Sequence, residues 1–276
     1  TLGVIGAYTK YNGSLDRSLG IYNQFEFNQN ENFVQGFHYS IVKRNINLYG
    51  ESSRSLNGGI ANLHGLMASL HPRLSLSVFY RNYGANYQTT FANSVGEGSR
   101  PINEKGLFTG LQFKVNKFWE ISSYFDQFQF PWMKYQVNQP NSKGMDGFIQ
   151  VLYHPTKKLN IYGRIRHRDK PYNEIENIQR NITNVYNVNQ WNFRLNINAS
   201  VTESIRIRNR VEYVSYLRFG GVTEKGILVL QDITYKPKES KISFTARFAL
   251  FDTDSYNSRI YSYENDVLYY FRIPAY

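Results

Sequence analysis

The chain has 276 residues, enough to bury a sizeable core, and its formal net charge of +11 is consistent with an acidic partner, such as lipopolysaccharide phosphates or nucleic acid, or with general solubility. Aromatic residues make up 16% of the sequence while the mean hydropathy is −0.50, a combination that suits alternating strands better than helices. No apolar run approaches the length of a membrane helix, and the absence of cysteine excludes disulfides and thiolate metal sites.

A strand is expected near Leu2 to Tyr8, and the clearest early pattern follows at residues 71–81. The turn-forming residues His71 to Arg73 precede a segment, 74–81, in which every second side chain is large and apolar. Alternation with a period of two predicts a half-buried strand, so this region is read as a hairpin.

The same pattern recurs later in the chain. Residues 191–200 alternate, turn at Thr202 to Ser204 and resume alternation at Ile205. Two further tight connections are predicted at 154–157 and 236–240, each between segments of period two. Long polar connections, rich in Asn, Gly, Ser and Pro, are expected at 85–105, 131–143 and 169–185.

Tight turns alternating with long loops are typical of outer-membrane β-barrels. We therefore expect an all-β fold: an antiparallel transmembrane barrel with about fifteen strands in residues 1–276, as one domain. Counting strands back from the segment near Asp266 to Ile273 leaves the first strand starting on the outer side. The domain is therefore expected to be incomplete at its start, and the export of the protein to the bacterial outer membrane follows from the barrel pattern alone.

Several blocks of sequence resemble a family of Bacteroidota outer-membrane proteins that combine a competence-protein-like helix-hairpin-helix region with a long barrel. The blocks are Leu76 to Tyr83, Gly98 to Leu107, Asp126 to Tyr135, Arg208 to Tyr213, Ala249 to Tyr256 and Tyr263 to Tyr269. The resemblance covers about residues 70–276 and only the barrel portion of that family. It implies a Gram-negative outer-membrane location, a barrel that continues beyond Tyr276 and an association with DNA handling, and it supplies no catalytic residue.

Arginines recur at alternate positions opposite apolar residues, and they are expected to share the face that lines the barrel lumen. The predicted basic ladder consists of Arg164, Arg166, Arg168, Arg194, Arg206, Arg208, Arg210 and Arg247. An arginine on the lipid side near the membrane midplane would cost about 2–4 kcal/mol, which favours the lumen.

Two interpretations of the ladder remain open. Converging guanidinium groups bind phosphate or carboxylate oxygens, so the ladder would form a path for an anionic substrate. Alternatively, luminal acids pair with the arginines and brace the wall, because buried arginines are commonly paired. The candidate acids are Glu120, Asp126, Glu212 and Asp232.

Aromatic residues near strand ends are expected to form interfacial girdles or to pack in the core, with base stacking as the sharper alternative. They are Tyr80, Tyr83, Trp119, Tyr153, Tyr162, Trp191, Tyr213, Tyr235 and Tyr269. The histidine spacing matches no zinc-protease motif and no nucleophile elbow occurs, so no enzyme activity, catalytic residue, cofactor or metal is expected.

Two functions fit these patterns. The first is a transport or uptake component whose electropositive lumen admits an anionic polymer, with DNA suggested by the family resemblance. The second is a non-transporting barrel that acts as a structural subunit of an envelope or secretion complex. Outer-membrane lipid and lipopolysaccharide are expected partners in both cases.

Overall fold

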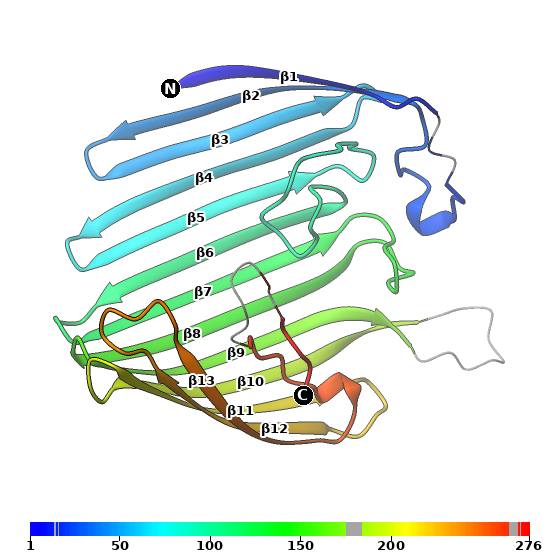
Figure 1. The fold of residues 1–276 in the computed structure, drawn as a ribbon. Coiled ribbons are helices and arrows are strands. Elements are labelled where there is room, and N and C mark those ends of the chain that lie inside the picture. Colours follow the sequence, from blue (N-terminus) through cyan, green and yellow to red (C-terminus); the bar gives the residue numbers. More distant parts are fainter. Residues whose placement is uncertain (14, 16, 175–183, 265–269, 271) are drawn as a thin grey trace. The chain divides into compact units, whose positions relative to one another are not determined.

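The computed structural model describes residues 1–13, 15, 17–174, 184–264, 270 and 272–276, and it contains one sheet of thirteen strands in sequence order (Figure 1). The strands are β1 (Leu2–Lys10), β2 (Glu31–Lys43), β3 (Ile46–Ser55), β4 (Ile60–His71), β5 (Leu74–Tyr83), β6 (Glu104–Lys114), β7 (Trp119–Phe130), β8 (Ser142–Thr156), β9 (Leu159–Asn173), β10 (Val185–Ser200), β11 (Ile205–Leu217), β12 (Glu224–Tyr235) and β13 (Phe244–Thr253). Two short 3-10 turns, η1 (Ile21–Asn23) and η2 (Tyr256–Ser258), accompany them. Across the described ranges, no helix has the length and apolar character needed to cross a membrane.

The all-β antiparallel class and most of the predicted turns are confirmed. The hairpin at 71–73 joins β4 to β5, and the turn at 202–204 joins β10 to β11. The loop predicted at 169–185 is longer than the connection in the structure, because β9 continues to Asn173 and β10 begins at Val185. The connection between β3 and β4 is as short as a tight turn, and the connection between β11 and β12 is shorter than the one between β12 and β13, so the alternation of short and long connections has two exceptions.

The expected count of about fifteen strands exceeds the thirteen described. After β13 the chain forms η2 and isolated bridges, which pair Tyr261 with Ala275 and Glu264 with Arg272. The predicted final strand near 266–273 falls mostly outside the described residues. Before that segment, Ile260 is buried in a cluster with Val214, Leu228 and Leu230 of β11 and β12.

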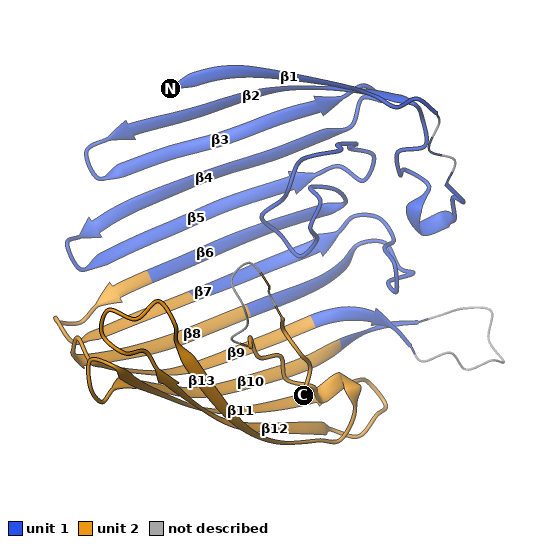
Figure 2. Ribbon diagram, in the orientation of Figure 1, with its two compact units in different colours: residues 1–111, 124–146, 170–187 blue, residues 112–123, 147–169, 188–276 orange. Residues whose placement is uncertain are grey.

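The described chain divides into two compact units (Figure 2). Unit 1 contains residues 1–111, 124–146 and 170–187, and unit 2 contains residues 112–123, 147–169 and 188–276. The expectation of a single barrel domain over 1–276 stays a prediction.

In unit 1, charged side chains are buried on one face of the sheet and several large apolar side chains are exposed on the other. Arg81 on β5 is 0% exposed and Glu104 on β6 is 2% exposed, whereas Leu107 on β6 is 46% exposed and Phe125 on β7 is 44% exposed. Because side chains alternate along a strand, Glu104 and Leu107 lie on opposite faces of β6. Unit 1 therefore has a buried charged face and an exposed apolar face.

Unit 2 has the same inverted arrangement. Glu212 on β11 and Asp232 on β12 are 4% and 2% exposed, whereas Leu195 on β10 and Val229 on β12 are 48% and 41% exposed. The strand register places Arg194 opposite Glu212, and it places Leu195 opposite the apolar Val211. We call the face that carries Arg194, Glu212 and Asp232 the arginine face.

A small apolar cluster interrupts the arginine face. Val214, Leu228, Leu230 and Ile260 are almost fully buried together, and Ala249 and Tyr276 pack against them. Leu228 and Leu230 are two and four residues before Asp232 on β12, so they share its face. The segment around Ile260 and Tyr276 therefore covers part of the arginine face rather than the exposed apolar one.

Candidate functional site

The registers of the three strand pairs from β10 to β13 place predicted basic and acidic residues directly opposite one another. Arg194 lies opposite Glu212, while Arg208 and Arg247 lie on either side of Asp232 in the neighbouring strands. These residues therefore share one face of unit 2, as alternation in the sequence predicts.

Three of the ladder arginines are paired with buried acids. Arg194 donates hydrogen bonds from Nε and Nη2 to the two Glu212 oxygens at 2.6 and 2.8 Å. Arg247 donates from Nε and Nη2 to the two Asp232 oxygens at 2.6 and 2.9 Å, and Arg208 also bonds to Asp232. The two-point contacts of Arg194 and Arg247 hold both partners in place on the arginine face.

The remaining ladder residues make different contacts. Arg210 donates from Nε to Asn196 at 3.5 Å and from Nη1 to Ser262 at 3.3 Å, and the Arg164 guanidinium lies 5.9 Å from the centre of the Phe148 ring. Arg206 is exposed. Arg166 and Arg168 occupy alternate positions after Arg164 on β9 and so lie on its side of the strand.

The four predicted acids do not act alike. Glu212 and Asp232 pair with ladder arginines, as described above. Asp126 pairs instead with Arg81, which is absent from the predicted ladder. Glu120 accepts a hydrogen bond from the Gln112 amide at 2.7 Å. Three of the eight ladder arginines, Arg194, Arg208 and Arg247, are therefore paired with predicted acids.

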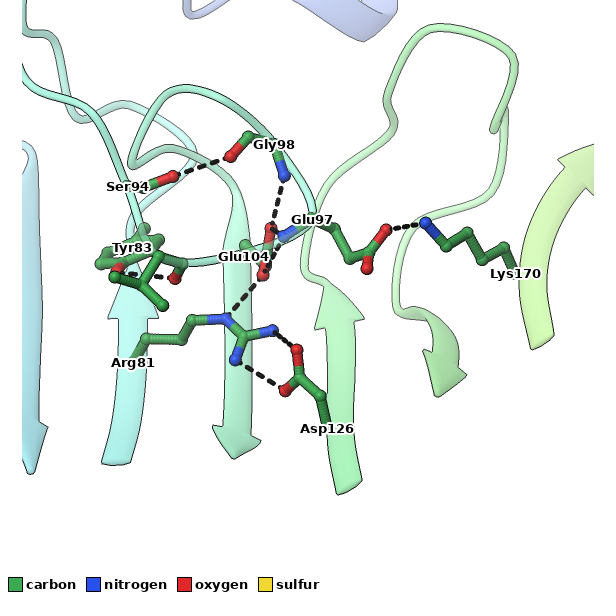
Figure 3. Close-up of polar contacts among 9 residues, drawn as sticks. Arg81, Tyr83, Ser94, Glu97, Gly98, Glu104, Asp126 and Lys170 are labelled. Atoms are coloured by element: carbon green, nitrogen blue, oxygen red, sulfur yellow. Dashed lines mark hydrogen bonds and ion pairs between the residues drawn. The ribbon is translucent and has the colours of Figure 1, made fainter. Parts of the chain in front are cut away.

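Arg81 is the centre of a buried charge cluster in unit 1 (Figure 3). Its Nε donates to Glu104 at 2.6 Å, and its Nη1 and Nη2 donate to the two Asp126 oxygens at 2.7 and 3.0 Å. The guanidinium also lies directly against Gly106, where a Cβ atom would occupy the same space. Strands β5, β6 and β7 are thereby joined by one side chain.

The same cluster anchors the long loop at 84–103. The Glu104 carboxylate accepts hydrogen bonds from the backbone N–H of Glu97 at 3.1 Å and of Gly98 at 3.3 Å (Figure 3). The Tyr83 hydroxyl donates to the Val95 carbonyl at 3.2 Å, and Lys170 pairs with Glu97. The loop is thus bonded to groups that line the charged face.

Apolar contacts hold the loop in the same position. Tyr87 is 4% exposed and forms a cluster with Ala61 and Tyr83, and Val34 and Ile102 pack against it. Ala61 is opposite Tyr83 in the β4–β5 register, so both side chains lie on the charged face. The loop at 84–103 therefore folds over part of this face in unit 1.

A separate pocket of about 320 Å³ lies among the long loops of unit 1. Glu26 accepts a hydrogen bond from Arg100 Nη1 at 2.8 Å, and this pairing lowers the pKa of the Glu26 carboxyl. Burial lowers the pKa of the Lys134 ammonium, which lies 4.0 Å from the centre of the Phe130 ring. Trp132 donates from its indole N–H to the Ile21 carbonyl at 3.0 Å, which ties two loops together.

Some of the expected girdle residues lie on the exposed apolar face of unit 2. Trp191 is 39% exposed and stacks on His167 at a centroid distance of 4.2 Å, and Trp119 stacks on Tyr153 at 4.4 Å. Tyr83 is 3% exposed beneath the loop at 84–103, which agrees with the core-packing interpretation rather than with a girdle. Tyr269 lies outside the described residues.

The pattern of arginines missed Arg81 because its neighbours at alternate positions, Phe79 and Tyr83, are aromatic rather than basic. The available signal was the alternation itself, which places Arg81 opposite Val78 and Tyr80. Glu97 and Glu104 gave no periodic signal, since the first lies in a loop and the second begins a strand. No group of three or more metal-ligating side chains occurs within the described part of the chain.

Comparison with protein-family models found no match, and comparison with curated proteins found none either. Among solved structures, the chain is similar to one described as "structure of porin refined at 1.8 angstroms resolution". The TM-score is 0.44 at 8% sequence identity, and the match covers 91% of this chain and 95% of the porin chain.

Proposed function

We propose that this chain is part of a bacterial outer-membrane β-barrel whose charged face lines the lumen and whose apolar face contacts lipid. The observation that carries the proposal is the inverted burial: Arg81 is 0% exposed while Phe125, two strands away, is 44% exposed. A soluble protein buries its apolar face, whereas a barrel in lipid exposes it and keeps charge inside. Outer-membrane lipid and lipopolysaccharide are then its first partners.

We further propose transport or uptake of an anionic substrate along the arginine face. The eight ladder arginines share unit 2 with Glu212, Asp232 and Glu120, so positive charge exceeds negative charge there. Two of these acids, Glu212 and Asp232, already form ion pairs with Arg194, Arg208 and Arg247. A surplus of one sign within a concave surface concentrates the counter-ion. The resemblance to a helix-hairpin-helix barrel family makes DNA the first polymer to test.

The direct test is ion conductance in planar bilayers. The proposal predicts channels that prefer anions and whose preference falls when Arg206 is replaced by Gln. The matched control is Lys238→Gln, which removes one positive charge from an exposed turn outside the proposed path. Channels that prefer cations, or an equal effect of the two variants, would refute the anion path.

A second function, a non-transporting structural subunit of an envelope or secretion complex, is favoured by a different observation. The loop at 84–103 covers part of the charged face of unit 1, and the segment around Ile260 covers part of the arginine face of unit 2. Such coverings would restrict a lumen. Absence of conductance from reconstituted full-length protein, together with its retention in a stable complex with other envelope proteins, would favour this function.

A further inference from the structure

A cavity of about 320 Å³ lies on the arginine face of unit 2, near the tight-turn ends of its strands. Lys157 and Lys158 form one rim, at the turn between β8 and β9. Arg206 and Arg208, near the start of β11, form another part of the wall. Basic residues far apart in sequence thus line the same cavity.

The charge of this cavity is only partly balanced. Asp232 is its sole acidic lining residue, and it already bonds to Arg208 and Arg247. Within the described residues, Lys157, Lys158 and Arg206 have no acidic partner. Three cations therefore face a shared space without compensation from the protein.

Arg208 provides a second observation that points to a ligand. One of its terminal nitrogens bonds to Asp232, while its Nε is buried and has no hydrogen-bond partner among the described residues. The Arg208 side chain as a whole is 26% exposed, so the accessible part of its guanidinium can donate to an anion in the cavity. Water alone would hydrate the group without neutralising the three cations.

The arrangement indicates the kind of anion. Arg206 and Arg208 are two residues apart on one strand, a separation of roughly 6.7 Å along the chain direction. A single small ion cannot reach both guanidinium groups and the two lysines equally well, whereas two linked phosphoryl groups present several oxygens over that distance. Guanidinium groups match phosphate oxygens in geometry, and lysines add point charge.

We propose that this cavity binds an anion with two adjacent phosphoryl groups, either a small diphosphate or a stretch of phosphodiester chain. The two phosphoryl groups would together bridge Lys157 and Lys158 at the turn and Arg206 and Arg208 on β11. Uncharged donors are present beside them, in the side chains of Asn160, Asn198 and Thr234. The inference rests on the proposed function, because it takes the arginine face to be the path of the anionic substrate.

The test uses the full chain in detergent micelles, with inorganic pyrophosphate as the probe and calorimetry as the readout. The Lys157→Gln, Lys158→Gln double variant should bind pyrophosphate about tenfold more weakly and with a shallower salt dependence, because two phosphate contacts are lost. The matched control is the Lys236→Gln, Lys238→Gln variant, which removes two lysines from a tight turn outside the cavity lining and should bind like the native chain.

The outcomes separate this site from the proposed function. The site is supported if pyrophosphate binding is saturable and only the Lys157→Gln, Lys158→Gln variant weakens it. This result supports the site even if the protein conducts no ions. Anion-selective conductance without pyrophosphate binding refutes the site and leaves the transport proposal standing. Equal weakening by the two double variants also refutes the site, since it shows a response to net charge. Competition by a single-stranded oligonucleotide assigns the site to a phosphodiester chain, and its failure to compete assigns it to small diphosphates.

Discussion

The Arg81 guanidinium occupies the space that a side chain at Gly106 would need. Gly106 is on β6, between the strands that supply Arg81 and Asp126. The absence of a Cβ atom there lets the guanidinium lie flat against the sheet and reach Glu104 on one side and Asp126 on the other. A glycine that looks unremarkable in the sequence is therefore part of the charge cluster.

The first prediction concerns this glycine. Gly106→Ala should lower the free energy of unfolding by about 1–3 kcal/mol, because the added methyl group displaces a buried, fully bonded guanidinium. Chemical denaturation in detergent would measure it. The control is Gly163→Ala on β9, where a Cβ atom meets nothing within 4 Å. Equal stability of the Gly106 variant and the native chain would show that Arg81 tolerates displacement.

The second prediction concerns pH and the loops of unit 1. The ordinary pKa of the Glu26 carboxyl is 4.5, and hydrogen bonding to Arg100 lowers it in the folded protein. A lowered folded pKa gives stability that is present above pH 4.5 and is lost as the pH falls through the folded value. Acidification from neutral pH to below 4.5 should therefore loosen the loop pocket.

Trp132 reports on that change, because it packs edge-on against Phe25 at a centroid distance of 5.6 Å. The fluorescence difference between the native chain and a Trp132→Phe variant should change on acidification. Glu26→Gln should abolish this titration, whereas Glu203→Gln, at an exposed turn in unit 2, should leave it intact. A titration that persists in the Glu26 variant would assign the effect to another group.

The third prediction tests the lipid-facing surface. Leu195→Lys should destabilise the protein in lipid by about 2–4 kcal/mol if Leu195 lies near the membrane midplane. Asn192→Lys on the opposite face of the same strand should have little effect, because a charge there would stay on the arginine face that is proposed to line the lumen. Folding yield and unfolding in liposomes would measure both variants. Equal destabilisation would contradict the assignment of the two faces.

Alternation fixed the faces of individual strands, and it therefore predicted that Arg194, Arg208 and Arg247 share one side. It did not predict partners, because pairing depends on the register between strands: Asp232 meets Arg247 only because β12 and β13 align at those positions. The alternation pattern did not predict the segments that cover part of each charged face, for a related reason. The Tyr87 and Ile260 side chains come from segments outside the strands, and nothing periodic marks where they bury.

The last prediction separates the arginines that brace the wall from those that are available to an anion. Arg194→Gln leaves the 4% exposed Glu212 without its two-point partner, so it should cost about 3–5 kcal/mol of stability. Arg206→Gln removes an exposed charge with no acidic partner among the described residues, so the free energy of unfolding should change by no more than about 0.5 kcal/mol.

Anion selectivity should follow the opposite order. Arg206→Gln should reduce it while the protein stays folded, and an Arg194→Lys variant, which keeps the charge, should conduct like the native chain if it folds. Unfolding in detergent and conductance in bilayers, measured on the same preparations, give the two readouts. If Arg206→Gln destabilises the protein as strongly as Arg194→Gln and leaves selectivity unchanged, then both arginines serve the wall and the ladder is not a path.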